Sequence, residues 1–183
     1  MRVVVTGSAG HLGSTVVAAL RQGGVEGVGV DVRSGSQTAI VADVRDARSM
    51  RRALHGASAV IHTAALHAPH VPLHSKREFI DVNATGTQIV LDAAAEASVG
   101  RVVYSSTTSV YGHALEPGDA AVWVDEDLMP RPRDIYDVTK LAAERLCELF
   151  TSETGIPTTC LRVSRFSFDT APGLAVPIAC TVR

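Results

Sequence analysis

The sequence predicts an α/β domain of three layers, in which a mostly parallel, doubly wound sheet lies between two layers of helices. Short runs of β-branched residues alternate along the chain with longer segments of helical periodicity. The expected strands read as continuous apolar runs, which are typical of parallel strands covered on both faces. A glycine-rich turn from Gly7 to Gly13 follows the first strand directly. Together these three observations favour the doubly wound class.

Six strands and four helical segments account for most of the chain. Each helical segment carries apolar residues at helical spacing and ends at or near a glycine, or at Ser98 just before Gly100. The irregular segment 113–134 is rich in proline, glycine and acidic residues, and a connection of that length is usually functional. In chain order the elements are strand 2–7, helix 14–23, strands 27–31 and 37–43, helix 47–56, strand 58–64, helix 75–98, strand 101–106, helix 136–155 and strand 158–163.

Composition excludes several classes of protein. A formal net charge of −2 with no block of like charges gives no reason to expect nucleic acid or an anionic membrane as a partner. No signal-peptide pattern follows Met1, and no apolar run approaches the roughly 20 residues that cross a bilayer. Cys147, Cys160 and Cys180 are odd in number and widely spaced, which argues against a disulfide or zinc framework. A cytoplasmic protein is expected.

The glycine turn has the spacing that binds a dinucleotide. Gly7, Gly10 and Gly13 open the first helix in the pattern G-x-x-G-x-x-G, so backbone N–H groups can approach a pyrophosphate at the positive end of that helix. Asp31 closes the second strand, where an acid binds the adenosine ribose and repels a 2′-phosphate. This favours NAD over NADP, although Arg33 lies close enough to keep NADP open. The alternatives are a ligand-free turn and a solvated Asp31.

Tyr136 and Lys140 form a second candidate pair, in the sequence YDVTK. Positions i and i+4 lie on one face of a helix, so the ammonium group of Lys140 can stand beside the phenol of Tyr136. A free tyrosine has a pKa of about 10, and a nearby positive charge lowers it toward the range useful for a base. The same spacing also occurs in exposed helix pairs with no catalytic role.

Considered together, these motifs resemble the extended branch of the short-chain dehydrogenase/reductase superfamily, the NAD-dependent epimerase/dehydratase family. The resemblance covers about residues 2–166 and includes the stretches VIHTAALHAP (60–69), FIDVNATGT (79–87) and VVYSSTTSVYG (102–112). It implies a Rossmann-like NAD-binding domain over 1–166 and a short tail over 167–183. The cofactor-binding residues that it implies are Gly7, Gly10, His11, Leu12, Gly13, Asp31, Asp43, Val44, Thr63, Ala64, Ala65, Tyr136 and Lys140.

The resemblance also implies how the catalytic residues work. Tyr136 exchanges a proton with the substrate oxygen, and Lys140 lowers the pKa of Tyr136 and holds the nicotinamide ribose. Thr107 orients the substrate oxygen, although an offset to Ser105, Ser106 or Thr108 stays open. Asn83 supports a helix near Lys140. The expected substrate is a small molecule, a sugar or nucleotide sugar, which changes at an alcohol or carbonyl carbon.

The histidines in HTAALHAPHVPLH do not predict a metal site. Only His70 and His74 have an i,i+4 spacing, and Pro72 between them disturbs a helical presentation. No cysteine or acid follows at a ligand-like distance. We interpret His67, His70 and His113 as residues of the substrate cleft.

The length of the chain departs from the family pattern. Members commonly have a second half that forms a substrate domain, and most of that domain is lacking here. We therefore expect either an active oxidoreductase or epimerase, or an NAD-binding regulatory or vestigial protein without turnover. In an active chain the segment 113–134, which contains Trp123, and the residues after His62 form the substrate pocket. Family members commonly form a homodimer through four helices, and the candidate residues for that face or for the core are Val90, Ala94, Leu146 and Leu149.

Overall fold

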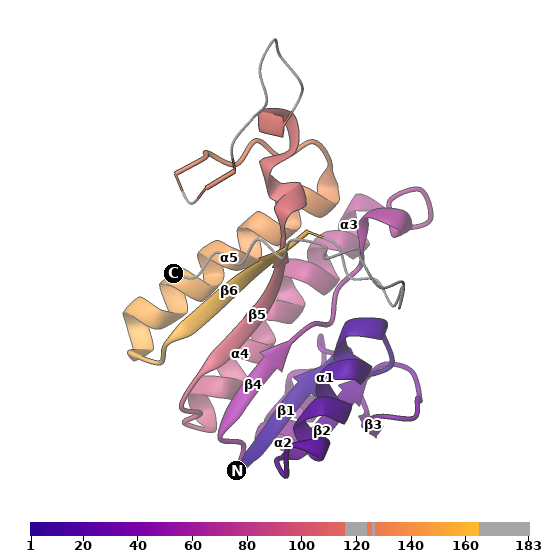
Figure 1. The fold of residues 1–183 in the computed structure, drawn as a ribbon, viewed down its shortest axis with the longest axis vertical. Coiled ribbons are helices and arrows are strands. Elements are labelled where there is room, and N and C mark those ends of the chain that lie inside the picture. The colour runs from indigo at the N-terminus through magenta and orange to yellow at the C-terminus, as the bar shows by residue number, and fades with distance from the viewer. Residues whose placement is uncertain (116–123, 126, 165–183) are drawn as a thin grey trace, which may run out of the picture.

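The computed structural model describes residues 1–115, 124–125 and 127–164. Six strands form one sheet in which every neighbouring pair is parallel, in the order β3-β2-β1-β4-β5-β6 (Figure 1). This is the doubly wound order that the sequence predicts. The strands are β1 (Arg2–Thr6), β2 (Glu26–Asp31), β3 (Thr38–Val41), β4 (Ala59–His62), β5 (Val102–Thr107) and β6 (Thr158–Val163).

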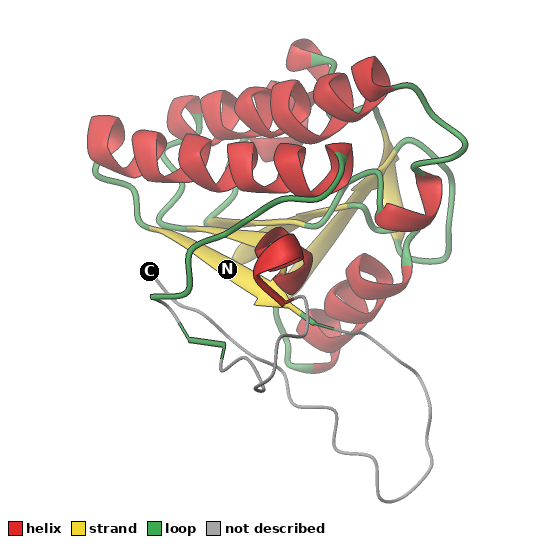
Figure 2. Ribbon diagram, turned by 90° about the horizontal axis from the view of Figure 1, so that it is seen from above, coloured by secondary structure: helices red, strands yellow, loops and turns green. Residues whose placement is uncertain are grey.

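Helices cover both faces of this sheet, which gives the three predicted layers (Figure 2). One face carries α1 (His11–Gln22), which packs on β1 and β2. The opposite face carries α2 (Ala47–Leu54), α4 (Gly86–Glu96) and α5 (Ile135–Thr154). Among the described residues no helix is both long and apolar enough to span a membrane.

The hydrophobic core is unequal on the two faces of the sheet. The larger cluster joins β-strand residues such as Val30 and Val60 to Met50 and Leu54 of α2. Val90 and Ala94, which were candidates for either a dimer face or the core, are fully buried in this cluster. Leu146 packs against it, whereas Leu149 is 50% exposed. The smaller cluster, under α1, contains Val3, Val5 and Val17.

The predicted helix 75–98 is interrupted, which corrects the sequence analysis. It consists of α3 (Lys76–Phe79), a π-helical turn η2 (Ile80–Thr85) and α4. The wider turn inserts one residue per turn, so Asn83 faces the interior and is 1% exposed. Periodicity does not distinguish a π-turn from an α-helix over one turn, which is why the sequence indicates a single helix.

The segment after β5 also has more structure than a plain loop. Two short 3₁₀ turns, together labelled η3 (Thr108–Leu115) and separated by a kink at Gly112, lie beyond the carboxyl end of β5 (Figure 1). Gly112 has φ +45°, and a Cβ there would meet the carbonyl oxygen of Arg131 at 2.2 Å. The backbone N–H of His113 donates to that same oxygen at 2.9 Å. Trp123 and the tail 167–183 lie outside the described residues.

Candidate active site

The glycine loop packs tightly against the ends of β1 and β4. Gly7 has φ +78°, and a Cβ on it would come within 2.7 Å of the side-chain oxygen of Thr63. A Cβ on Gly13 would lie 2.2 Å from the carbonyl oxygen of Gly7. Gly10 is the N-cap of α1, and no side chain caps the first turn that His11 and Leu12 begin. The backbone N–H groups at the positive end of α1 are therefore not capped by a side chain and can bind a pyrophosphate.

Asp31 lies beside this loop at the end of β2. Its carboxylate accepts hydrogen bonds from the backbone N–H of Ala9 at 3.0 Å and of Arg33 at 2.9 Å. Asp31 is 9% exposed, and the guanidinium of Arg33, 3.8 Å away, is largely exposed. These groups fit the adenosine half of NAD. The carboxylate of Asp31 is held in place by hydrogen bonds, and it lies next to the start of α1, which no side chain caps.

Asp43 and Val44 follow β3 and have different surroundings. The Asp43 carboxylate binds the guanidinium of Arg45, with Nη2 at 2.6 Å from Oδ2. Hydrogen bonding to Arg45 holds the pKa of Asp43 below its usual value. Val44 is buried and its Cγ2 approaches Gly86, where a Cβ would lie only 2.8 Å away. An adenine amino group that binds Asp43 would therefore donate to a carboxylate that already accepts hydrogen bonds from Arg45.

His62, at the end of β4, lies in a buried chain of hydroxyl groups. Thr87 donates its hydroxyl to the carbonyl of Asn83 at 2.6 Å, so it must accept from Nε2–H of His62 at 3.0 Å. Nδ1 then accepts from the hydroxyl of Thr6 at 2.6 Å. The imidazole is therefore neutral, and burial lowers the pKa of His62 to about 3. His62 therefore has a structural role: its hydrogen bonds to Thr6 and Thr87 hold the end of β4, from which the chain continues to Thr63.

Those next residues, Thr63 to Ala65, run along the carboxyl end of the sheet. The hydroxyl of Thr63 donates to the carbonyl of Thr6 at 2.6 Å, and the N–H of Ala64 donates to the hydroxyl of Thr6 at 3.3 Å. Ala65 follows and is half-buried. This segment contacts the glycine loop through Gly7, so the structure brings both parts of the predicted cofactor site together.

Asn83 joins that segment to the catalytic helix. Its Oδ1 accepts from the N–H of Leu66 at 2.7 Å, and its Nδ2 donates to the carbonyl of Leu66 at 3.0 Å. The same Nδ2 donates to the hydroxyl of Thr139 at 3.1 Å. Asn83 thus connects the chain after β4 with α5, between Tyr136 and Lys140. This is a more specific position than the general support role that the sequence suggests.

Thr107 and Tyr136 face each other at the end of β5. The Thr107 side chain hydrogen-bonds the Tyr136 phenol and also accepts the N–H of Ser109 at 3.1 Å. Burial raises the pKa of Tyr136, and the Thr107 hydrogen bond acts in the opposite direction. The neighbouring Ser106 turns away, because its hydroxyl donates to Glu144 at 2.5 Å. These contacts therefore favour Thr107 over Ser106 as the partner of Tyr136.

Lys140 is buried one helical turn after Tyr136. Its ammonium group donates to the carbonyl of Ser105 at 2.5 Å and lies 4.3 Å from the ring centre of Tyr104. Burial lowers the pKa of Lys140 to about 8, and the charge of Glu144 offsets part of that shift. At neutral pH the amine is still mostly protonated, but the pKa of Tyr136 is raised and not lowered, because burial outweighs the predicted influence of Lys140. The Tyr104 hydroxyl is buried and has no hydrogen-bond partner in the described part of the chain.

Sequence reasoning missed a buried ion pair behind Lys140. Arg162 of β6 donates to Glu144 of α5 through Nη2 at 2.7 Å and through Nε at 3.0 Å, and both side chains are at most 13% exposed. Arg162 also donates to the hydroxyl of Tyr111 at 2.9 Å. The i+4 spacing from Lys140 could have indicated Glu144, but nothing in the sequence pairs it with Arg162.

Asp137, inside YDVTK, is a second missed residue. It is fully buried, accepts the hydroxyl of Ser109 at 2.5 Å and accepts the N–H of Arg133 at 3.1 Å. Asp134 caps the same helix through the N–H of Asp137 at 3.0 Å. These bonds fasten η3 to the start of α5. The segment that carries Thr107 is thereby fixed relative to Tyr136.

Three histidines form a row that begins at Tyr136. The ring of His67 is stacked on Tyr136, with centroids 6.2 Å apart, and His70 and His74 follow at spacings of 5.8 and 5.9 Å. His74 pairs with Glu78 at 3.1 Å. His113 lies in η3 and is exposed. In the described ranges no three His, Cys, Asp or Glu side chains are grouped as a metal site would require.

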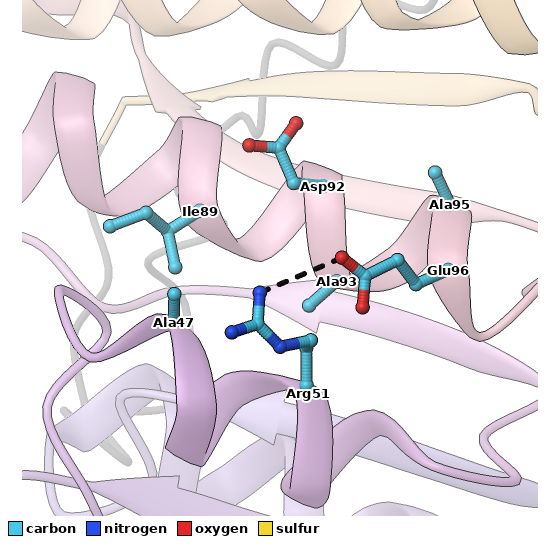
Figure 3. A pocket seen from close by; sticks show the side chains of 7 residues that line it. All are labelled: Ala47, Arg51, Ile89, Asp92, Ala93, Ala95 and Glu96. Atoms are coloured by element: carbon cyan, nitrogen blue, oxygen red, sulfur yellow. Dashed lines mark ion pairs between the residues drawn. The ribbon is translucent and has the colours of Figure 1, made fainter.

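Two hollows on the described surface lie outside this constellation. One separates α2 from α4 and is crossed by the ion pair of Arg51 with Glu96 at 3.6 Å (Figure 3). None of its lining residues is a predicted site residue. The other lies between the segment after His70 and the start of α5, and it is lined by Val71, His74, Lys76, Pro132, Arg133, Asp134, Ile135 and Val138.

Known proteins resemble this chain in sequence and in fold. A dTDP-glucose 4,6-dehydratase of Streptomyces niveus is 32% identical over 171 residues, which cover 80% of this chain and 48% of that protein. A 3beta-hydroxysteroid-dehydrogenase/decarboxylase of Arabidopsis thaliana is 31% identical over 152 residues, covering 82% of this chain and 33% of that protein. The solved structure of MoeE5 in complex with UDP-glucose and NAD matches with a TM-score of 0.79 and 35% identity, over 89% of this chain and 54% of that one.

The chain thus spans about half the length, or less, of these relatives. The model of the NAD dependent epimerase/dehydratase family matches residues 3–167. The range includes the glycine loop, Asp31, Asn83, Thr107, Tyr136 and Lys140, and the cofactor of the family is the one that the glycine loop and Asp31 predict. The chain belongs to the NAD-dependent epimerase/dehydratase family.

Proposed function

We propose that these residues form the NAD-binding and proton-transfer half of an oxidoreductase or epimerase. Its substrate is a sugar or a nucleotide-sugar-like molecule that changes at an alcohol or carbonyl carbon. The observation that carries this proposal is the juxtaposition of Thr107, Tyr136 and Lys140 at the edge of the sheet where the glycine loop ends. The sugar nucleotides named for the dehydratase and for MoeE5 support the substrate class.

The chemistry follows from the three side chains. When bound, NAD⁺ supplies the hydride acceptor. Tyr136 accepts the hydroxyl proton of the substrate, and Thr107 orients the substrate oxygen by donating or accepting a hydrogen bond. We expect the protonated amine of Lys140, one helical turn away, to favour the phenolate form of Tyr136, against the burial that raises the pKa of this phenol. In the reducing direction the same phenol returns the proton to the carbonyl oxygen.

Cofactor binding relies on the other half of the constellation. Gly7, Gly10 and Gly13 present the first turn of α1 to the pyrophosphate, and Asp31 receives the ribose hydroxyls. His11, Leu12, Val44 and the segment Thr63 to Ala65 line the same edge as expected contacts, with Asp43 shared with Arg45. Lys140 contacts the nicotinamide ribose.

A second candidate function is NAD binding without turnover. The glycine loop and Asp31 favour it, because they could hold the cofactor without any contribution from Thr107 or Tyr136. The two functions differ in one measurement. An oxidoreductase forms NADH or an epimer from UDP-glucose, whereas a binding protein shows only the thermal shift caused by NAD⁺.

We also expect a homodimer through α4 and α5. Val138 and Leu149 are each 50% exposed on α5, and Ile80 is 45% exposed in η2. The spacing of Val138 and Leu149 places both side chains on the same face of α5, where they could contact a second copy of the chain. Leu149→Arg should convert a dimer to a monomer in size-exclusion chromatography with light scattering. A wild-type chain that is monomeric at all concentrations contradicts this expectation.

The decisive test of the proposed function separates binding from chemistry. NAD⁺ should raise the melting temperature of the wild-type chain, and Asp31→Ala should reduce that rise. Tyr136→Phe should keep the rise and lose turnover of UDP-glucose by about a hundredfold or more, because a general base is removed. No effect of NAD⁺ or NADH on melting contradicts both candidate functions.

A further inference from the structure

The imidazole of His67 occupies a position that the proposed chemistry leaves unused. Its ring lies against that of Tyr136, with centroids 6.2 Å apart and planes inclined by 27°. Tyr136 is only 7% exposed, whereas His67 is an exposed residue. Any substrate that brings an oxygen to the phenol therefore also meets the edge of this imidazole.

The backbone before His67 is held in place by side chains. Asn83 binds both the N–H and the carbonyl of Leu66, and it also binds Thr139 of the catalytic helix. The N–H of His67 itself donates to Nδ1 of His70 at 2.9 Å. The imidazole is thus positioned relative to Tyr136 by bonds that reach α5, as a preorganised binding group requires.

The surroundings of His67 keep its ring neutral. Burial of the ring among its neighbours, together with the charge of Lys140, lowers the pKa of His67 to about 4. A neutral imidazole offers one N–H donor and one ring nitrogen acceptor. Because the side chain of His67 already accepts from the backbone N–H of His70, the ring N–H is the group left to donate to a substrate hydroxyl.

We infer that His67 is a substrate-specificity residue, whose imidazole hydrogen-bonds a hydroxyl group on the carbon next to the reacting one. The inference rests on the proposed function and decides between the substrate types named for the relatives. A sugar ring has a hydroxyl at that position. Pregnenolone, the 3β-hydroxysteroid used in the test below, has only C–H groups there, so it would cover the N–H of His67 without offering it an acceptor, at a cost in affinity.

The test compares ligand affinities in NAD⁺-saturated protein, so it does not require turnover. UDP-glucose and the 3β-hydroxysteroid pregnenolone are titrated into wild type, His67→Phe and His67→Gln by isothermal titration calorimetry. His67→Phe keeps an aromatic ring beside Tyr136 and removes both nitrogens, and it should weaken UDP-glucose binding about tenfold. His67→Gln keeps a donor and an acceptor and should stay within about threefold of wild type.

Two further measurements make every outcome decisive. His55→Phe, at an exposed position outside the site, should leave UDP-glucose affinity unchanged. In wild-type protein labelled at histidine, the imidazole resonances that are missing in His67→Gln should shift when UDP-glucose is added. This observation holds even if His67→Phe does not fold.

The inference is overturned if the His67 resonances do not move, if His67→Phe binds UDP-glucose as wild type does, or if pregnenolone binds wild type more tightly than UDP-glucose. Failure of the proposed function has a different signature. In that case UDP-glucose binds and depends on His67, but no NADH or epimer forms in wild type.

Discussion

The two halves of the candidate site are built by different means. The cofactor half, at the ends of β1, β2 and β4, depends on backbone: Gly7 and Gly13 allow contacts that a Cβ would prevent. The catalytic half, at the end of β5 and on α5, depends on side chains such as Lys140 and Arg162, which are buried and charged. Substitutions in the cofactor half should therefore act by steric exclusion. Substitutions in the catalytic half should act by leaving buried charges or polar groups unpaired.

The largest effect is expected at the buried ion pair of the catalytic half. Arg162→Met leaves Glu144 as an uncompensated buried charge, which should reduce the free energy of unfolding by about 3–5 kcal/mol. Urea denaturation measures it. Glu144→Gln combined with Arg162→Met should recover much of the loss. Arg145→Met removes an exposed pair with Glu148 and should cost at most about 1 kcal/mol. Equal losses for Arg162→Met and Arg145→Met contradict this account.

Lys140 gives the catalytic half a dependence on pH. Its pKa is about 8 in the folded chain and 10.5 ordinarily, so the unfolded chain binds more protons between these values. Raising the pH through this window therefore stabilises wild type, by about 3 kcal/mol at most. Lys140→Met lacks this gain. Its stability relative to wild type should fall between pH 8 and 10.5, as followed by urea denaturation at several pH values.

The matched control for Lys140 is Lys76→Met, on the exposed start of α3. Its stability relative to wild type should stay constant over the same pH range. A constant difference for Lys140→Met as well means that the buried amine is not the source of the pH dependence.

A smaller loss of stability is expected in the cofactor half. Gly13→Ala places a Cβ against the carbonyl of Gly7 and should cost about 1–3 kcal/mol, with strongly reduced NAD⁺ affinity. Gly24→Ala is the matched control, because Gly24 has φ +74° but nothing within 4 Å of an added Cβ. It should show only the modest strain of its backbone and bind NAD⁺ normally. Calorimetric titration with NAD⁺ compares the two variants, and equal NAD⁺ affinities exclude the proposed role of Gly13.

The same division explains what could be predicted from the sequence. The strand runs, the spacing of Gly7, Gly10 and Gly13, and the position of Asp31 are local patterns, and the structure has all of them at the expected edge of the sheet. The i,i+4 relation of Tyr136 and Lys140 is also local. The resemblance implies Thr107 as the partner of Tyr136, and in the structure the interaction with Thr107 lowers the pKa of Tyr136 against the effect of burial.

The remainder depends on contacts between distant parts of the chain. The Glu144–Arg162 pair joins α5 to β6, and the π-turn that directs Asn83 inward differs from an α-helix by one residue. The stacking of His67 on Tyr136 brings together residues nearly 70 positions apart in the sequence. Neither the periodicity of the sequence nor the residue types predict contacts between such distant residues.

The central claim is that the cofactor half binds NAD⁺ independently of the proton-transfer residue. Calorimetric titration of NAD⁺ into wild type and Tyr136→Phe tests it most directly. The account predicts saturable binding with one site per chain in both proteins and affinities within about threefold, because Tyr136 makes at most one of several contacts. Absence of binding in wild type, or its loss in Tyr136→Phe, would contradict the account.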